Sequence, residues 1–263
     1  MSRERRLVFG EVAELYDRYR PTYPARLIDD LVELARLGGR RSVLEVGAGT
    51  GKATVLFADR GIPMIAVEPS EEMIAIGRHN LCMVGNLEFE QGDFETWDPV
   101  GRRFALVFSA QAWHWIDPSI GYEKARSILE PDGVLAAFWN RLDWASAPAR
   151  DVLVATYRRA APDLVPDEDP MHPARELSDD YQSWRAHATA AGLGQTAVRH
   201  YEWTLTYSAD EYAGRLMTSS GMRLLDDERR RAVIEEVRTA IQHGGGTLTL
   251  PQSTELCLAR RPS

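Results

Sequence analysis

Three glycines, Gly47, Gly49 and Gly51, alternate with other residues directly after the short apolar run Val43–Val46. A buried strand that leads into a glycine turn and then a helix lets backbone N–H groups approach a ligand closely. From Lys52 onward the apolar spacing becomes helical, so the turn and the helix N-terminus face one crevice. This stretch therefore predicts a binding site for an anionic or nucleotide-like ligand.

Nicotinamide- and flavin-binding domains share such a turn with S-adenosylmethionine (SAM) methyltransferases. The dinucleotide fingerprint requires its third glycine five positions after the first, where this chain has Lys52. Glu45, two residues before the first glycine, would repel a pyrophosphate but suits a ligand with an ammonium and a sulfonium. Spacing and charge favour SAM, and an NAD-dependent oxidoreductase stays the alternative.

Two further acids follow predicted strands. Glu68 ends the strand expected over 63–67 and lies 21 positions beyond Gly47, where a carboxylate can accept both ribose hydroxyls of an adenosine. Asp93 and Phe94 follow the strand expected over 87–90, and Asp93 can accept the adenine amino hydrogens. Either acid could instead be an ordinary loop residue, and for Asp93 the preceding Gly92 also makes a common turn pair.

His114 follows the apolar strand expected over 104–108, between Trp113 and Trp115. Histidine can take a proton from a hydroxyl near neutral pH, and the tryptophans could form a dry wall around it. The alternative is a packed histidine that only shapes the pocket, and a carboxylate acceptor would need no base.

Four stretches, 44–51, 67–70, 92–94 and 109–115, occur in the order and spacing of class I SAM-dependent methyltransferases. The chain most resembles their small-molecule branch, which includes the trans-aconitate methyltransferase-like (type 11) proteins. The resemblance implies an α/β fold, a Rossmann-like seven-stranded, mostly parallel sheet with an antiparallel last strand, plus a helical cap insertion. It implies one domain over 1–263, with an N-terminal lid segment at 1–22 and cap helices at 140–247 around the sixth strand.

The residues and the resemblance together define a predicted site. The expected cofactor-binding residues are Tyr16, Arg20, Glu45, Gly47, Gly49, Gly51, Glu68, Asp93, Phe94 and Ala110. His114 is the candidate catalytic residue. The candidate substrate-binding residues are Trp113, Trp115, Trp139, Trp144 and Met217, although each aromatic side chain could equally belong to the core.

Apolar periodicity predicts the remaining elements. Helices are expected over 9–19, 24–35, 70–78, 118–129, 149–161, 179–191, 209–217 and 227–243, with an acidic loop at 162–170. A fifth strand is expected over 134–139, a sixth over 195–207 and a closing strand over 254–259. The strand and helix alternation through the fifth strand predicts a parallel sheet with right-handed crossovers.

Composition limits the classes of function. The 263 residues carry a formal net charge of −8, which argues against a broad nucleic-acid surface, and no Asp/Asn-Pro-Pro-aromatic tetrad follows the fourth strand. Cys82 and Cys257 form neither a disulfide framework nor a metal-ligand pattern, so no metal is expected. The sequence shows no membrane-length apolar run and no secretory signal, so a cytoplasmic protein is expected.

These observations predict a SAM-dependent methyltransferase that yields S-adenosylhomocysteine and methylates a small organic acceptor. Oxygen, as a carboxylate or a hydroxyl, is the favoured atom. A catalytically inactive SAM-binding protein is the alternative outside enzymes. The acceptor's identity and the oligomeric state stay open.

Overall fold

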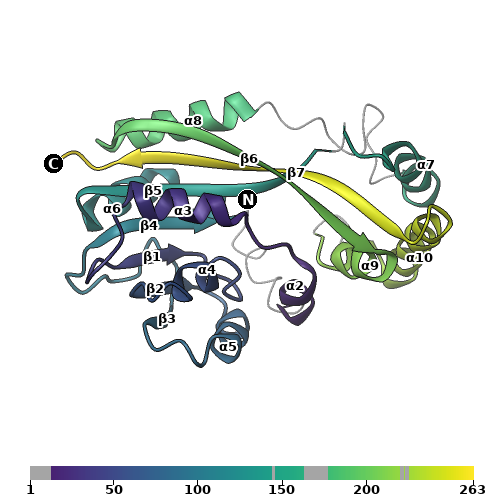
Figure 1. Cartoon of the computed structure of the whole chain (residues 1–263), viewed down its shortest axis with the longest axis horizontal. Coiled ribbons are helices and arrows are strands. Elements are labelled where there is room, and N and C mark those ends of the chain that lie inside the picture. The colour runs from purple at the N-terminus through teal and green to yellow at the C-terminus, as the bar shows by residue number, and fades with distance from the viewer. Residues whose placement is uncertain (1–12, 144–145, 163–176, 220–221, 223–224) are drawn as a thin grey trace.

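The computed structural model describes residues 13–143, 146–162, 177–219, 222 and 225–263. Seven strands form one sheet in the order β3-β2-β1-β4-β5-β7-β6 (Figure 1). Strand β7 is antiparallel to both β5 and β6, and the pairs among β1 to β5 are parallel, so the predicted fold is confirmed. The strands are β1 Val43–Val46, β2 Met64–Glu68, β3 Leu87–Gln91, β4 Phe104–Ala110, β5 Leu129–Leu142, β6 Gly194–Ser208 and β7 Thr247–Arg260.

The described helices follow the predicted apolar spacing to within a few residues at each end. Ser70 accepts a hydrogen bond from the Met73 N–H and Asp226 accepts one from the Arg229 N–H, so both helices begin at a side-chain cap. The helices are α2 Ala13–Tyr19, α3 Ala25–Leu34, α4 Thr54–Ala58, α5 Glu71–Asn80, α6 Pro118–Ile128, α7 Arg150–Ala160, α8 Leu177–Ala190, α9 Ala209–Met217 and α10 Asp227–His243, with a 3-10 turn at Trp113–Trp115.

Helices cover both faces of the sheet. Leu27 of α3 and Phe57 of α4 pack on one face, whereas Tyr122 of α6 and Trp184 of α8 pack on the other. Strands β1 and β4 are buried along their whole length, as parallel strands between two helical layers must be. The carboxyl ends of β1, β2 and β4 therefore meet at one rigid edge.

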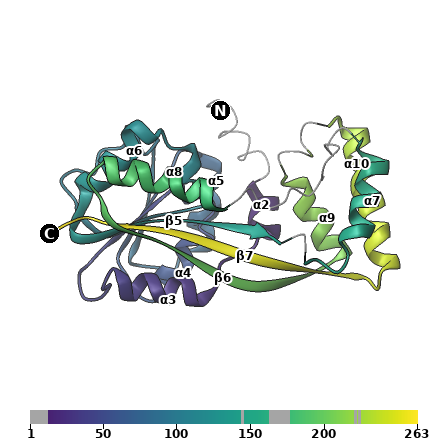
Figure 2. The same cartoon turned by 90° about the horizontal axis from the view of Figure 1, so that it is seen from above.

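Strands β5 and β7 are longer than predicted, whereas β6 agrees with its predicted range to within one residue at each end. Beyond the sheet, β6 and β7 continue as a two-stranded ribbon that ends with Ser208 opposite Thr247. Figures 1 and 2 show this ribbon reaching away from the sheet to α7, α9 and α10. The prediction stopped short because Pro251 and the polar Gln252 and Ser253 interrupt the apolar pattern of β7.

The predicted cap region divides into two parts. Helices α7, α9 and α10 share a core of their own, which includes Tyr212 and Val237. We refer to these three helices as the cap. Helix α8 packs against α6, β6 and β7 and so belongs to the sheet layers, which corrects its expected place among the cap helices.

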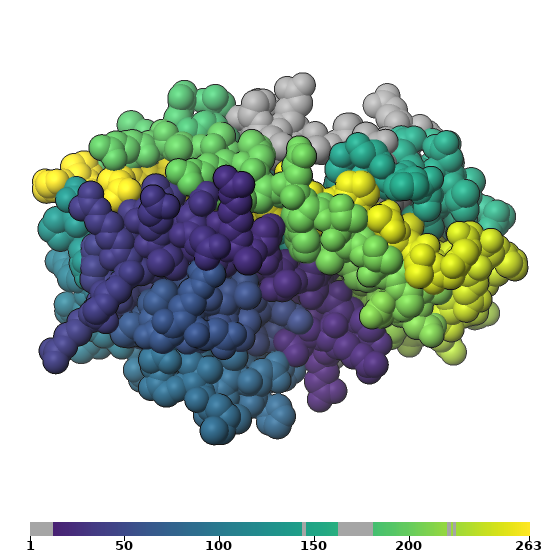
Figure 3. Space-filling view, viewed as in Figure 1, coloured from purple at the N-terminus to yellow at the C-terminus, as the bar shows by residue number. Residues whose placement is uncertain are grey.

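Helix α2 lies between the sheet body and the cap (Figure 3). It contacts α5 on one side and α9 on the other. Of the expected helix over 9–19, residues 9–12 lie outside the described part of the chain. Among the described residues, every helix is too short or too polar to cross a bilayer.

Candidate functional site

The glycine turn after β1 has the backbone conformation that its sequence requires. Gly47, Gly49 and Gly51 have φ angles of 72°, 58° and 87°, in the left-handed region that favours glycine. A Cβ on Gly47 would lie 2.5 Å from the Cβ of Ala112. The N–H groups of Gly47 and Ala48 both donate to the Val67 carbonyl, so the turn is fixed against β2.

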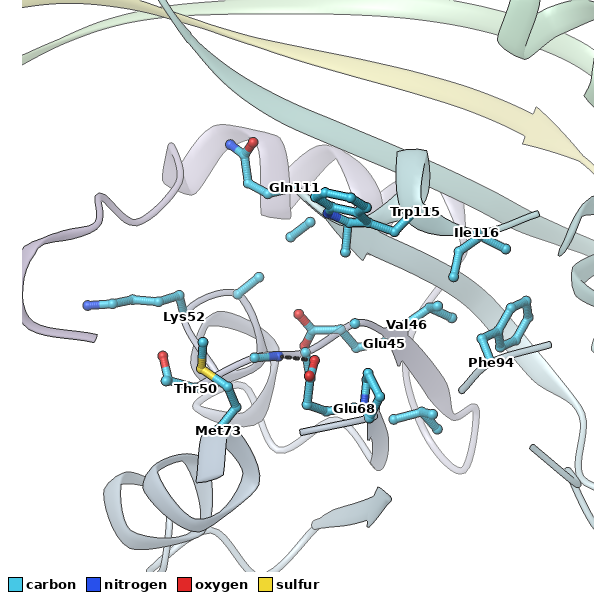
Figure 4. Close-up of a pocket in the computed structure, with 18 of the residues that line it drawn as sticks. Glu45, Val46, Thr50, Lys52, Glu68, Met73, Phe94, Gln111, Trp115 and Ile116 are labelled. Atoms are coloured by element: carbon cyan, nitrogen blue, oxygen red, sulfur yellow. Dashed lines mark hydrogen bonds between the residues drawn. The ribbon is translucent and has the colours of Figure 1, made fainter. Parts of the chain in front are cut away.

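A cavity of about 940 Å³, including space open to solvent, lies over this turn at the carboxyl ends of β1, β2 and β4 (Figure 4). We refer to it as the first cavity. Its size and position are typical of ligand sites in open α/β sheets. Predicted residues that line it are Tyr16, Glu45, Gly47, Gly49, Glu68, Asp93, Phe94, Ala110 and Trp115.

Glu68 holds the floor of the first cavity. Its Oε2 accepts a hydrogen bond from the Gly49 N–H at 2.9 Å, and its Oε1 accepts one from the Ser70 N–H at 3.1 Å. A carboxylate has about four acceptor positions, so two remain for a ligand. Burial raises the pKa of Glu68 and the two N–H donors oppose that rise.

Glu45 lies at the end of β1 and is 1% exposed. Its Oε2 accepts a hydrogen bond from the Thr54 hydroxyl at 2.6 Å, whereas its buried Oε1 has no hydrogen-bond partner among the described residues. Burial raises the pKa of Glu45 to about 8, against the lowering effect of Thr54. Burial therefore disfavours an uncompensated negative charge on this carboxyl, and a cation beside it would offset that effect. An unpartnered buried oxygen is what a ligand ammonium requires.

Asp93 and Phe94 form the side of the first cavity that follows β3. The Phe94 side chain is 2% exposed, and the Lys124 ammonium lies 5.3 Å from the centre of its ring. The Asp93 carbonyl accepts hydrogen bonds from the N–H groups of Thr96 and Trp97, which fixes the loop. The side chain of Asp93 lines the cavity from this fixed position.

A second cavity, of about 850 Å³ including open space, adjoins the first. Residues that line both are Tyr16, Tyr23, Lys52, Gln111 and Trp115, which therefore form a common wall. Figure 4 shows Gln111 and Trp115 across the first cavity from Glu68 and Met73. The residues that line only the second cavity are Arg20, Pro21, His114, Asn140, Arg215 and Gln252.

His114 is exposed at the second cavity, and its Nδ1 accepts a hydrogen bond from the Trp139 indole N–H at 3.2 Å. A neutral imidazole has one acceptor nitrogen and one N–H donor. With Nδ1 as the acceptor, the proton resides on Nε2. In this tautomer the ring has no second acceptor nitrogen, and the predicted role of His114 as a base stays a prediction.

Several predicted residues lie away from the first cavity. Arg20 reaches only the second one. Gly51 packs under the turn, where a Cβ would lie 2.9 Å from Cδ1 of Leu81. Trp113 is 4% exposed and its ring packs against Tyr122 and Phe94, so it is a core residue.

The remaining candidate substrate residues lie outside both linings. Trp139 reaches the second cavity only through its hydrogen bond to His114. Met217 is 41% exposed on α9 and lines neither cavity. Trp144 lies outside the described residues.

Gln111 and Tyr23 belong to the common wall but were not predicted as site residues. Gln111 has a φ of 62°, a strained conformation for a residue other than glycine, at the end of β4. Its place within the 109–115 stretch was a signal that the prediction did not use. Tyr23 is buried two residues before α3 begins, and the sequence shows there only an aromatic residue before Pro24.

No cluster of metal-ligating side chains occurs in the part of the chain that the structure describes. The polar groups at the site are carboxylates that accept hydrogen bonds from N–H or hydroxyl groups. One oxygen of Glu45 has no hydrogen-bond partner among the described residues. This arrangement suits an organic ligand that carries hydroxyls and an ammonium, so it fits SAM.

A family model described as a methyltransferase domain matches residues 43–133. An uncharacterized methyltransferase of Mycobacterium tuberculosis (strain ATCC 25618 / H37Rv) is 31% identical over 189 residues, which span 70% of each chain. A methyltransferase-like protein of Schizosaccharomyces pombe, also uncharacterized, is 28% identical over 155 residues and covers 57% of this chain and 59% of that one.

Solved structures share the fold. A proposed type II methyltransferase from Anaeromyxobacter dehalogenans superposes with a TM-score of 0.65 at 21% identity, over 93% of this chain and 99% of that one. A second match is the phosphoethanolamine N-methyltransferase 2 of Haemonchus contortus, solved with phosphomonomethylethanolamine and S-adenosylhomocysteine. Its TM-score is 0.57 at 12% identity, over 97% of this chain and 58% of that one.

Proposed function

Because this chain belongs to the SAM-dependent methyltransferase family, we propose that it transfers a methyl group to an oxygen of a small organic acceptor bound in the second cavity. The observation that carries the proposal is the common wall between the two cavities. An acceptor in the second cavity would therefore lie next to a methyl group held in the first. Methyl transfer needs this alignment and the exclusion of water more than any acid or base.

The first cavity supplies a group for each polar part of the cofactor. Glu68 retains two acceptor positions for the ribose hydroxyls. Asp93 accepts from the adenine amino group, with the Phe94 backbone N–H at the ring. The unpartnered oxygen of Glu45 accepts from the ammonium. Gly47 and Gly49 allow the backbone to approach closely.

The bound cofactor supplies an activated methyl group on a sulfonium. The chain's own residues would hold the acceptor oxygen in line with that methyl and keep water out. Trp115 and Tyr23 provide apolar surface at the common wall, and Gln111 provides an amide for orientation. Residues 13–22 close the site from one side through Tyr16, which supports a lid role for the N-terminal segment.

The geometry of His114 favours an acceptor that is already ionised. The imidazole accepts from Trp139 at Nδ1, so its Nε2–H can donate to an acceptor oxygen but cannot take a proton from one. A carboxylate needs no base and is favoured over a hydroxyl on this ground.

Calorimetry with SAM, S-adenosylhomocysteine and NAD tests the cofactor assignment. We expect both adenosyl ligands to bind and NAD not to bind. Turnover with methyl-labelled SAM and a panel of carboxylates and hydroxyl compounds then tests the transfer. Cofactor binding without turnover of any acceptor would favour an inactive SAM-binding protein.

Glu68→Gln tests the ribose assignment. The substitution keeps one acceptor oxygen but loses the negative charge, so we expect S-adenosylhomocysteine affinity to fall by about 1 to 3 kcal/mol. Thermal unfolding of the variant must be measured alongside, because Glu68 also holds the Gly49 and Ser70 N–H groups. Unchanged affinity in the folded variant would contradict the assignment.

A further inference from the structure

Two arginines from distant parts of the chain line the second cavity. Arg20 follows α2, and Arg215 lies on α9 of the cap. Neither lines the first cavity, so both lie beyond the common wall from the methyl donor. Among the described residues that line the second cavity there is no aspartate or glutamate.

Arg215 is half-buried and has no acidic partner among the described residues. Its guanidinium lies 5.8 Å from the ring centres of both Tyr207 and Tyr212. Its Nε is buried and has no hydrogen-bond partner among the described residues. A guanidinium has five N–H donors, and a buried donor without an acceptor is costly.

Arg20 is held in place from one side only. Its Nε donates to the Thr218 hydroxyl at 2.9 Å and its Nη2 donates to the Thr218 carbonyl at 2.8 Å. Its guanidinium also lies 5.4 Å from the centre of the Tyr16 ring. These contacts fix the plane of the group and leave Nη1 without an acceptor among the described residues.

The cavity is electrostatically suited to an anion. Burial lowers the pKa of Arg20, and the positive charge of Arg215 adds to that lowering. Lys52, on the common wall, pairs with Asp17 only at 3.9 Å. An oxyanion between the two guanidinium groups would relieve their repulsion and supply acceptors for their donors.

Gln252 provides an independent observation. Its side chain is 3% exposed and lines the same cavity, yet its Nε2 has no hydrogen-bond partner among the described residues. Asn140 lies nearby on β5 and also lines the cavity. A buried amide N–H₂ that faces a polar cavity is a further donor for an oxyanion.

We propose that the acceptor carries an oxyanion, a carboxylate or a phosphate, that binds between Arg20 and Arg215 with Gln252 as an additional donor. The methylated oxygen lies at the other end of the acceptor, against the common wall. This inference rests on the proposed function. The oxyanion would then determine which acceptors bind. A bound acceptor would also contact both the N-terminal segment, through Arg20, and the cap, through Arg215.

The test uses the full chain saturated with S-adenosylhomocysteine and isothermal calorimetry. The probes are glutarate, inorganic phosphate and the uncharged glutaramide. We expect at least one of the two anions to bind about tenfold or more tightly than glutaramide, and its affinity to fall as NaCl is raised. Tight binding of glutarate alone assigns a carboxylate, and tight binding of phosphate alone assigns a phosphate.

Arg215→Gln should lower the affinity for the preferred anion by about tenfold, and Arg215→Lys should restore part of it. Both variants should keep their affinity for S-adenosylhomocysteine. Arg185→Gln, an equal charge change at an exposed position of α8, is the matched control and should have no effect. Thr218→Val removes the hydroxyl that accepts from Arg20 Nε but leaves the positive charge of Arg20 in place. It therefore distinguishes the effect of the orientation of Arg20 on anion affinity from the effect of its charge.

Normal S-adenosylhomocysteine binding without any preference for an anion would overturn this inference and leave the proposed function intact. Anion binding that Arg215→Gln does not weaken would also overturn it. Failure to bind S-adenosylhomocysteine would instead overturn the proposed function.

Discussion

Glu45 is almost fully buried, and one of its carboxyl oxygens has no hydrogen-bond partner among the described residues. The sequence argument treated Glu45 as a fixed negative charge that repels a pyrophosphate. Burial raises its pKa to about 8, which favours the neutral carboxyl when no cation is bound. Both arguments favour a cationic ligand. The structure adds that burial disfavours the ionised form of the Glu45 carboxyl when no cation is bound.

Glu45→Gln should flatten the dependence of stability on pH. The pKa of Glu45 is about 8 in the folded chain and has an ordinary value of 4.5, so between these pH values the native state retains a proton that the unfolded chain loses. The wild-type free energy of unfolding should therefore fall as pH rises from about 5 to 8, by at most about 1.4 kcal/mol per pH unit from this group.

Urea unfolding of both proteins across that pH range measures the effect. Glu68, whose pKa is also raised, contributes in the same direction in both proteins, so the difference between the two profiles reports Glu45 together with its electrostatic coupling to Glu68. Parallel profiles would show that Glu45 ionises normally in the fold.

His114→Ala should lower the single-turnover rate of methyl transfer to a carboxylate by less than about tenfold, because its loss removes a donor and not a base. General bases contribute about 10² to 10⁴ in rate. S-adenosylhomocysteine affinity should not change, since His114 lines only the second cavity. A loss of about 100-fold or more, greatest for hydroxyl acceptors, would establish His114 as a base and require its bond to Trp139 to break.

Residue types at strand ends could be predicted well because the edge of a parallel sheet gathers them in one place. Glu45, Glu68 and Asp93 come to one cavity for this reason. The tryptophans could not be assigned in the same way. Trp113 and Trp115 are two residues apart in a 3-10 turn, and one enters the core while the other lines the cavity.

At the level of elements, α2 is the link between the sheet body and the cap. Asp17 accepts a hydrogen bond from the Asn80 amide of α5, and Arg20 donates to Thr218 at the end of α9. Tyr19 packs against Gly214 so closely that a Cβ on Gly214 would lie 2.4 Å from the ring. The contact between α2 and α9 therefore depends on that glycine.

Gly214→Ala should displace α2 and weaken retention of S-adenosylhomocysteine. Alanine favours a helix over glycine by about 1 kcal/mol, so α9 itself should not be destabilised. Limited proteolysis of the N-terminal segment and ligand dissociation rates would measure the displacement. Gly38→Ala is the matched control, because a Cβ there meets nothing within 4 Å. Equal dissociation rates in both variants would show that α2 does not close the cofactor cavity.

Helix positions were predictable from apolar spacing, and for some helices also from their ends: α5 begins at the Ser70 cap, and α10 begins at the Asp226 cap and ends at Gly244. The element against which each helix packs could not be predicted in the same way. Helix α8 has the same amphipathic pattern as its neighbours in the chain, yet Trp184 and Ala188 place it on the sheet, whereas α7 lies in the cap. Apolar periodicity gives the buried face of a helix but not the element that covers it.

At the level of the whole molecule, β6 and β7 join the sheet to the cap without a break in pairing. The cap should therefore unfold with the sheet, in one transition. Leu250→Ala in the cap half of β7 and Leu256→Ala in its sheet half both remove fully buried side chains, at a cost of about 2 to 5 kcal/mol each.

Thermal unfolding of either variant should show a single transition with a lowered midpoint. The curves recorded by far- and near-ultraviolet circular dichroism should coincide. A separate early transition in Leu250→Ala alone would show that the cap is an independent folding unit.

Ser208 and Thr247 lie opposite each other at the far end of the ribbon, so the chain over 209–246 departs from and returns to one place. A segment whose two ends lie together can be exchanged between related proteins as a single insert, provided that the new segment makes equivalent contacts with α2 and α7. Arg215 belongs to this stretch and Arg20 does not. Recombination of one continuous piece of gene could thus replace the Arg215 side of the second cavity while the first cavity is inherited intact.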